Sequence, residues 1–225
     1  MTKLLAKKFG LPIVDINELA GFLKEKKLKK WRRISGPTLI DSYLKKEELN
    51  LNILRFVPQI EVVTFSNPEN HPFVGVRNRT ADGVVVFTIL PGNYIPVCAE
   101  FKHGAEEVSI NLPGGGNFSG KNPHIQAKKE FEQETGIILK NVTGLSSKGI
   151  SNDARANANR AYYFIGNVSN PLRVIPRKLD KGEFLETFLI SIEDWLKLIG
   201  NNGVIDGQSV IATFLALQQS RYFKR

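Results

Sequence analysis

The chain has 225 residues, of which 42% are hydrophobic and 24% are charged, a composition typical of a globular protein that can bury a full core. Its longest uninterrupted apolar runs, such as residues 84–87, are far shorter than a membrane span, and the N-terminus lacks a secretory signal pattern. The single cysteine, Cys98, excludes an internal disulfide framework and fits a reducing compartment, so we expect a cytoplasmic protein without a membrane segment.

The formal net charge of +9 is concentrated at the N-terminus. Residues 1–33 contain ten Lys or Arg against three Asp or Glu, a surplus of +7. A helical period occurs in residues 13–30, where the apolar positions are Ile16, Leu19, Ala20 and Leu23. A basic arm attracts nucleic acid, acidic lipid or an anionic substrate, although a solvated helix face explains the same charge. We interpret residues 1–52 as a basic, partly helical extension and residues 53–225 as the main domain.

Several segments rich in Val, Ile and Phe predict strands. Residues 53–65 predict one broken or edge strand, because Pro58 interrupts the pattern. Residues 84–90 and 94–101 predict two strands joined by a Pro-Gly-Asn turn, so we expect them to form a hairpin. The remaining predicted elements are strands at 108–112, 137–142, 160–168 and 185–190, and helices after Ser191 and at 209–222. This mixture of strands and helices indicates an α/β sandwich.

Residues 113–137, PGGGNFSGKNPHIQAKKEFEQETGI, carry the most informative pattern. Three consecutive glycines allow the backbone to turn tightly and to approach a ligand closely. Pro123 fits the first turn of a helix, which Gly136 would end. Glu130 and Glu134 are four residues apart, so they share one helix face with Cβ atoms roughly 6 Å apart. That face can hold a divalent cation, although a solvated face of mixed charge is the alternative.

This stretch resembles the signature of the Nudix hydrolases, which is Gly, five residues, Glu, seven residues, then Arg-Glu-apolar-x-Glu-Glu-x-Gly-apolar. Gly115 opens the match, and residues 129–137 close it without a gap. Three positions depart from the signature. Lys121 replaces its first Glu, Lys129 replaces the Arg, and Gln133 replaces the first residue of the Glu-Glu pair.

Segments outside the signature are similar to one branch of that family, the ADP-ribose or ADP-sugar pyrophosphatases. The run Ala-Glu-Phe-Lys-His-Gly resembles the Gln-aromatic-Arg-His-Gly strand of this branch, with Glu100 and Lys102 replacing Gln and Arg. Asn111 stands where the branch has the Glu of Glu-Leu-Pro-Ala-Gly, and residues 182–186 resemble its Gly-Glu-Phe-x-Glu stretch. The resemblance covers about residues 53–220 and implies a mixed β-sheet sandwiched between helices (α/β/α).

The resemblance also implies an activity, the metal-dependent hydrolysis of a nucleoside diphosphate linked to another group, such as ADP-ribose or an ADP-sugar. The carboxylates of Glu130 and Glu134 and the carbonyl of Gly114 would hold Mg²⁺ or Mn²⁺. Gln133 would contribute an uncharged and therefore weaker ligand. Glu183 would complete the metal shell or take a proton from the attacking water. The substrate-binding residues that the resemblance implies are Lys102, Glu100, Asn111, Lys121, Lys129 and Glu186, of which Glu186 is also the less favoured catalytic alternative to Glu183.

The three departures leave functional alternatives open. Lys121 either binds a substrate phosphate or points into water, and Lys129 lacks the planar fork that holds a carboxylate at two points. A Nudix-fold nucleotide-binding or nucleic-acid-associated module with weakened catalysis is therefore the main alternative. A third hypothesis is an enzyme acting on nucleotide-capped RNA, with the basic arm adding affinity. Relatives in this branch are commonly dimers, so the resemblance also implies a homodimer.

Overall fold

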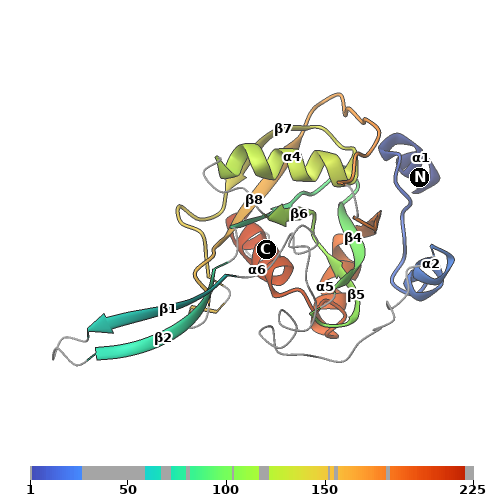
Figure 1. Cartoon of the computed structure of the whole chain (residues 1–225). Helices are drawn as coiled ribbons and strands as arrows, with labels where there is room; N and C mark the ends of the chain where they lie inside the picture. Colours follow the sequence, from blue (N-terminus) through green and yellow to red (C-terminus); the bar gives the residue numbers. More distant parts are fainter. Residues whose placement is uncertain are drawn as a thin grey trace.

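The structure is a computed structural model with a mixed α/β fold (Figure 1). It describes residues 2–26, 59–66, 72–79, 82–102, 104–116, 122–151, 153–154, 157–180 and 183–220. In chain order the elements are α1 (Thr2–Phe9), α2 (Leu19–Glu25), β1 (Gln59–Ser66), β2 (Pro72–Arg79), β3 (Gly83–Phe87), β4 (Tyr94–Lys102), β5 (Glu107–Asn111), β6 (Gly114–Gly116), α4 (Pro123–Thr135), β7 (Leu139–Gly144), β8 (Ala161–Val168), β9 (Leu185–Ser191), α5 (Ile192–Gly200) and α6 (Gly207–Gln219).

β3 lies inside a four-stranded sheet with the order β6-β3-β8-β7, where it pairs antiparallel with β6 and parallel with β8. Helix α4 packs on one face of this sheet and α6 on the other (Figure 1). Successive β3 side chains alternate between the two cores: Val84 and Val86 join the cluster beneath α4, and Val85 and Phe87 join the cluster that includes α5 and α6. A strand covered on both faces reads as a continuous apolar run. The predicted α/β/α arrangement is confirmed.

The predicted hairpin between residues 84–90 and 94–101 is wrong. β3 and β4 lie in different sheets, because β4 pairs with β5 and β9 in a three-stranded antiparallel sheet. The two strands share only an isolated bridge between Leu90 and Tyr94. Gly92 (φ 89°) and Asn93 (φ 62°) do form the expected turn, but it directs the chain from one sheet into the other. A turn signal specifies a reversal of direction, and long-range packing decides which strands pair.

The N-terminal segment packs into both cores. Phe9 and Leu11 belong to the cluster beneath α4, and Val14 and Leu19 belong to the other. The helical period predicted for residues 13–30 is confirmed only for α2. Before α2 the chain is extended, because Ile13 forms a parallel bridge to Leu189 and covers the open edge of β9. Residues 27–30 lie outside the described part of the chain.

The local signals at helix ends are confirmed. Pro123 occupies the first turn of α4, and the Asn122 side chain accepts a hydrogen bond from the His124 N–H. Gly136 ends this helix in the left-handed conformation (φ 72°). Ser191 caps α5 by accepting a hydrogen bond from the Asp194 N–H. Each of these signals acts within a few residues of the helix end, so it could be predicted without knowledge of the tertiary fold.

The predicted strand at residues 53–65 corresponds in part to β1, which pairs antiparallel with β2. Residues 53–58 lie outside the described residues. β2 was not predicted, because glycine and polar residues interrupt its apolar pattern. Figure 1 shows the β1–β2 pair extending away from the main body. Among the described helices, none is long and apolar enough to span a membrane.

The burial of α1 predicts a large stability effect at Phe9, which is fully buried. Phe9→Ala should lower the free energy of unfolding by about 3–5 kcal/mol, because it leaves a cavity beneath α4. Lys8→Ala, at an exposed position of the same helix, should change it by less than about 0.5 kcal/mol. Urea denaturation of the full chain measures both values. Equal effects of the two substitutions would show that α1 does not contribute to the folded core.

Candidate functional site

Residues 112–116, which we call the glycine turn, are anchored to the core on two sides. The Leu112 N–H donates to the Ser209 hydroxyl at the start of α6 (2.8 Å). The Val86 N–H in β3 donates to the carbonyl of Pro113 (2.9 Å). Ser209 is fully buried, so this contact is shielded from water. The turn is therefore fixed to β3 and α6 before any ligand binds.

Close packing explains why two positions of the turn are glycines. A Cβ at Gly114 would lie 2.2 Å from the Val84 carbonyl oxygen, which is part of the β3 backbone. A Cβ at Gly115 would lie 2.7 Å from Oε2 of Glu130. In addition, the Gly114 N–H donates to Oε2 of Glu134 (3.0 Å). Both glutamates of α4 therefore lie against the glycine turn, as their helical spacing predicts.

Glu134 is the most buried acid of the site, with 6% of its surface exposed. Burial raises the pKa of its carboxyl well above the ordinary value, and the charges of Glu100, Glu130 and Glu183 add to the rise. The hydrogen bond from Gly114 acts in the opposite direction. A carboxylate in this environment favours a nearby cation, because its negative charge is only partly compensated by the protein.

Residues of β4 and β9 contact Glu134 at its carboxylate and at its backbone carbonyl. The Cys98 thiol lies 3.7 Å from Oε2 of Glu134, and burial together with this carboxylate raises the pKa of the thiol well above 9.0. The predicted interpretation of Cys98 as a small buried residue is confirmed. The Thr187 hydroxyl donates to the backbone carbonyl of Glu134 (2.7 Å) and accepts from Arg177 (3.1 Å). Thr187 therefore links α4, β9 and the segment that precedes β9.

Glu130 lies half-buried at the rim of the same site. Burial raises the pKa of its carboxyl, and the nearby charges of Glu183 and Asp180 contribute to the rise. Lys129, whose Nζ lies 4.0 Å from Oε1, lowers this pKa, as does the hydrogen bond that the Gln126 amide donates. Glu183 is exposed, and its carboxylate accepts a hydrogen bond from the Asp180 N–H (2.8 Å). The predicted catalytic acids therefore influence one another electrostatically.

A polar cavity of about 250 Å³ opens beside the glycine turn. Asn111 lines it and is 7% exposed; its Nδ2 donates to Glu100 (3.2 Å), whereas its buried Oδ1 has no hydrogen-bond partner. Lys102 also lines the cavity and pairs with Glu100 at 2.5 Å. Arg160 and Gln208 contribute further polar groups to the wall. A cavity lined by charged and amide side chains is suited to a polar ligand.

Gln133 is engaged on a different flank of α4. Its Nε2 donates to the Lys178 carbonyl (3.1 Å), and the Lys178 N–H donates back to the Gln133 carbonyl (3.0 Å). This pair of bonds, the Gln133 clasp, fastens the segment before β9 to the helix. A glutamate at position 133 would present two acceptors to the Lys178 carbonyl, so the side-chain bond requires the amide. The clasp gives the Gln133 departure a structural explanation.

The predicted site residues thus fall into three groups. Those at the glycine turn or its cavity are Gly114, Glu130, Glu134, Glu100, Lys102 and Asn111. Those on the surrounding rim are Lys129, Glu183 and Glu186, the last of which pairs with Arg177 at 3.6 Å. Gln133 bonds Lys178, and Lys121 lies outside the described residues. Within the described part of the chain, no group of three or more His, Cys, Asp or Glu side chains is arranged to hold a metal ion.

The sequence patterns missed several residues of the site. Gln126 is 5% exposed and bonds Glu130, and its i, i+4 spacing on α4 was a signal that could have identified it. Thr187 and Arg177 gave no such signal, because they reach Glu134 only through the pairing of β9 with β4. Arg160 likewise lines the cavity only because β8 lies parallel to β3.

Comparisons with known proteins concern the sequence and the fold as a whole. No protein-family profile matches the chain. The chain is 26% identical to the ADP-ribose pyrophosphatase of Bacillus subtilis (strain 168) over 142 residues, which cover 61% of this chain and 73% of that protein. It is 25% identical to the methanol dehydrogenase activator of Bacillus methanolicus over 163 residues, covering 72% of this chain and 85% of that protein. The crystal structure of an ADP compounds hydrolase matches with a TM-score of 0.60 and 15% identity, covering 85% of this chain and 97% of that one.

The fold and the sequence similarity agree with the Nudix-type hydrolase that the signature in residues 113–137 predicts. Within that class the chain is similar to the ADP-ribose pyrophosphatases. The structural neighbour shares the α/β arrangement over nearly its whole length.

The Gln133 clasp makes a prediction for Gln133→Glu. Because a carboxylate cannot donate to the Lys178 carbonyl, the segment before β9 should loosen. Hydrogen–deuterium exchange of residues 173–180 should become about tenfold faster, and exchange in α6 should not change. Gln133→Ala should have the same effect. Unchanged exchange with tighter Mn²⁺ binding in Gln133→Glu would instead place residue 133 among the metal ligands.

The raised pKa of Glu134 makes a prediction for stability. Between the ordinary pKa of 4.5 and the higher folded-state pKa, the folded state binds more protons at Glu134 than the unfolded state does. The stabilisation that protonated Glu134 contributes is therefore complete below about pH 4.5 and is lost as pH rises through the folded-state pKa. The thermal midpoint of the metal-free protein should therefore fall with rising pH over this window. The thermal midpoint of Glu134→Gln should fall less with rising pH, because the amide does not ionise and still offers an oxygen to the Gly114 N–H.

Thermal unfolding at a series of pH values, with and without millimolar Mn²⁺, measures this effect. The metal should raise the midpoint of the unsubstituted protein near neutral pH, and it should raise that of Glu134→Gln much less. Identical pH profiles for the two proteins would contradict the assignment of the buried charge to Glu134.

Proposed function

We propose that the protein hydrolyses the diphosphate bond of a nucleoside diphosphate linked to another group, with ADP-ribose or an ADP-sugar as the first candidates. The observation that carries this proposal is the position of two α4 carboxylates against the glycine turn, where Glu134 accepts a hydrogen bond from the Gly114 N–H and Glu130 lies beside Gly115. The polar cavity beside the turn offers room for part of the substrate. The products would be a nucleoside monophosphate and a phosphorylated remainder.

The residues present fit a divalent cation. Glu130 and Glu134 are held close to the same turn, and the pKa of each is raised by burial and by neighbouring negative charge. Mg²⁺ is commonly held in proteins by one or two carboxylates, together with waters and substrate phosphates, so two acids suffice. We propose Mg²⁺ or Mn²⁺ bound by these two side chains and the Gly114 carbonyl. When bound, such an ion neutralises phosphate charge and lowers the pKa of a water molecule.

The surrounding residues then have distinct tasks in the proposed reaction. Glu183 is exposed and its charge acts on Glu130, so we propose that its carboxylate, which also accepts a hydrogen bond from the Asp180 N–H, takes a proton from the attacking water. Glu186 is less suited to that task, because it pairs with Arg177. The lysines proposed to attract the substrate phosphates are Lys102, Lys121 and Lys129. Asn111, with its unpaired oxygen, and Glu100 are proposed to bind substrate hydroxyl groups. The proposal includes a homodimer, as the family resemblance implies, and a cytoplasmic location, as the single cysteine favours.

A second candidate function is nucleotide binding with weakened catalysis. One observation favours it: the Gln133 side chain, which stands where the signature has a glutamate, donates a hydrogen bond to the Lys178 carbonyl. This candidate predicts that ADP-ribose binds in calorimetry without turnover in Mg²⁺ or Mn²⁺. Binding with turnover would exclude it.

The proposed reaction predicts that Glu134→Gln lowers turnover of ADP-ribose by a hundredfold or more, roughly the contribution of one positioned catalytic group. Glu193→Gln, at an exposed position of α5, is the matched control and should retain full activity. Release of AMP, measured with Mg²⁺ and with Mn²⁺, gives both rates. Parent-level turnover in Glu134→Gln would overturn the assignment of the metal site.

A further inference from the structure

The glycine turn begins where the chain passes from one sheet into the other. β5 ends at Asn111 in the three-stranded sheet, and β6 begins at Gly114 in the four-stranded sheet. The Leu112 N–H lies between these strands and donates to the Ser209 hydroxyl on α6 (2.8 Å). Leu112 and Ser209 are both buried. Because a buried N–H without a partner is costly, the Ser209 hydroxyl stabilises the turn in this position.

A second contact fixes the direction of the Ser209 hydroxyl. Oδ2 of Asp206, the residue that caps α6, lies 2.5 Å from Oγ of Ser209 and also accepts the Ser209 N–H (3.0 Å). The hydroxyl has one proton, and it points to the carboxylate, so the oxygen keeps its lone pairs for the Leu112 N–H. The hydrogen bonds therefore run in one direction, from Leu112 through Ser209 to Asp206. We call these three groups the α6 anchor.

The α6 anchor lies two residues from the backbone that meets Glu134. Pro113 follows Leu112, and its ring restricts φ while its carbonyl accepts from the Val86 N–H (2.9 Å). The next N–H, that of Gly114, donates to Glu134 (3.0 Å). Three consecutive residues are thus held at α6, at β3 and at α4. Since proline leaves this segment little freedom, a displacement of Leu112 would also displace Gly114.

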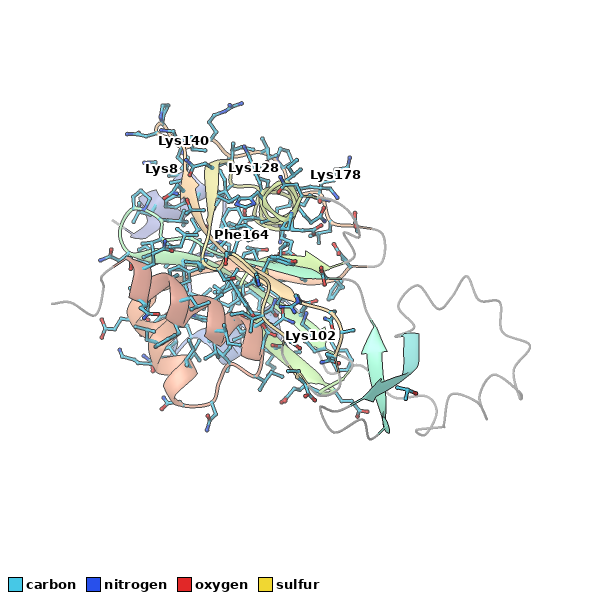
Figure 2. All side chains as sticks on the ribbon, turned by 90° about the vertical axis from the view of Figure 1, so that its left-hand side faces the viewer. Lys8, Lys102, Lys128, Lys140, Phe164 and Lys178 are labelled. Carbon is cyan, nitrogen blue, oxygen red and sulfur yellow. The ribbon has the colours of Figure 1, made fainter. Side chains whose placement is uncertain are left out.

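The anchor connects two helices that lie on opposite sides of a sheet. Figure 2 shows the red C-terminal helices on one side of the strands and the yellow-green helix α4 on the other. β6, at the edge of the four-stranded sheet, lies between them. Ser209 of α6 bonds the start of the glycine turn, and Glu134 of α4 bonds its middle. A side chain on one side of the sheet therefore sets the position of the backbone that faces the acids on the other.

A neighbouring hydroxyl on α6 has a different task. The Thr213 side chain donates to the Ser209 carbonyl (2.8 Å) and accepts from the indole N–H of Trp195 in α5 (2.9 Å). Thr213 is buried like Ser209 and lies one helical turn further along. Its two bonds join α5 to α6 and do not involve the glycine turn. Thr213 is therefore a matched comparison for Ser209.

We propose that Ser209, held by Asp206, is a positioning residue for the metal site. It would fix the glycine turn so that the Gly114 carbonyl and the two glutamates of α4 bind one divalent cation together. This inference rests on the proposed function, which assigns those groups to the cation. Ser209 is fully buried and acts only through the turn. Residues that orient metal ligands typically change metal affinity by roughly tenfold to a hundredfold when they are replaced.

The test compares Ser209→Ala with Thr213→Val in the full chain. Each substitution removes one buried hydroxyl from α6 and leaves one buried N–H without its partner, so the two should lower the thermal midpoint by similar amounts. Ser209→Cys retains the side-chain volume but offers only a weak acceptor, and it replaces the alanine variant if that variant does not fold. The Kd for Mn²⁺ is measured without substrate, by electron paramagnetic resonance of the free ion, at a temperature where each protein is folded.

Both Ser209 variants should raise the Kd for Mn²⁺ by roughly tenfold or more, and Thr213→Val by less than about twofold. Their release of AMP from ADP-ribose should be low at limiting Mn²⁺ and approach the parent rate at saturating Mn²⁺. Thr213→Val should follow the parent at every Mn²⁺ concentration. A loss of stability alone would not produce this dependence on the metal.

Asp206 provides a conservative comparison within the anchor. Asp206→Ala removes the group that directs the Ser209 hydroxyl, so it should also raise the Kd for Mn²⁺. Asp206→Asn keeps an acceptor oxygen and remains a good helix cap, so it should bind Mn²⁺ nearly as tightly as the parent. Equal Kd values for Asp206→Ala and Asp206→Asn would contradict the role of Asp206.

Equal Mn²⁺ affinities of Ser209→Cys and Thr213→Val would overturn the inference. Hydrogen–deuterium exchange of residues 112–116 gives a readout that requires no metal. It should be about tenfold faster in the Ser209 variants and unchanged in Thr213→Val. Failure of the proposed function is distinguishable, because the parent would then neither bind Mn²⁺ nor release AMP. The difference in exchange would still show whether Ser209 holds the turn.

Discussion

The structure depends on the burial of one carboxylate, that of Glu134, against the backbone of the glycine turn. A buried charge is costly unless hydrogen bonds or an opposite charge compensate it. Here the Gly114 N–H supplies one hydrogen bond, and the Cys98 thiol supplies a weak contact. Both partners come from strands far from α4 in sequence. The need to satisfy this carboxylate therefore ties the helix, the turn and β4 together at a single point.

This constraint also explains the composition of the turn. β6 pairs so closely with β3 that a side chain at Gly114 would collide with the Val84 carbonyl, and Glu130 occupies the space beside Gly115. β3 cannot move away to make room, because its two faces support separate cores. The rigidity of the central strand is thus transmitted directly to the two carboxylates. A site built on such an element needs little rearrangement to receive a charged ligand.

The parts of this architecture that could be predicted are those encoded within a few residues. Pro123, Gly136 and the four-residue spacing of Glu130 and Glu134 mark the helix and its acidic face, and the structure agrees. Residue spacing cannot show that β4 pairs in a different sheet from β3. Nor can it show that Thr187 bonds the Glu134 carbonyl, 53 positions away in the chain. Those features depend on how the two sheets pack, which is a property of the whole chain.

The distribution of charge around the site follows from the same constraint. Glu100, Glu130 and Glu183 already raise the pKa of Glu134, so a further carboxylate at position 133 would add repulsion within a crowded cluster of acids. Gln133 avoids that repulsion and also donates to the Lys178 carbonyl. In the proposed reaction, the acids would repel an anionic substrate in the absence of a cation, whereas Lys129 at the rim would attract it. The arrangement therefore favours a ligand that reaches the acids together with a metal ion and has enough additional negative charge to engage the rim.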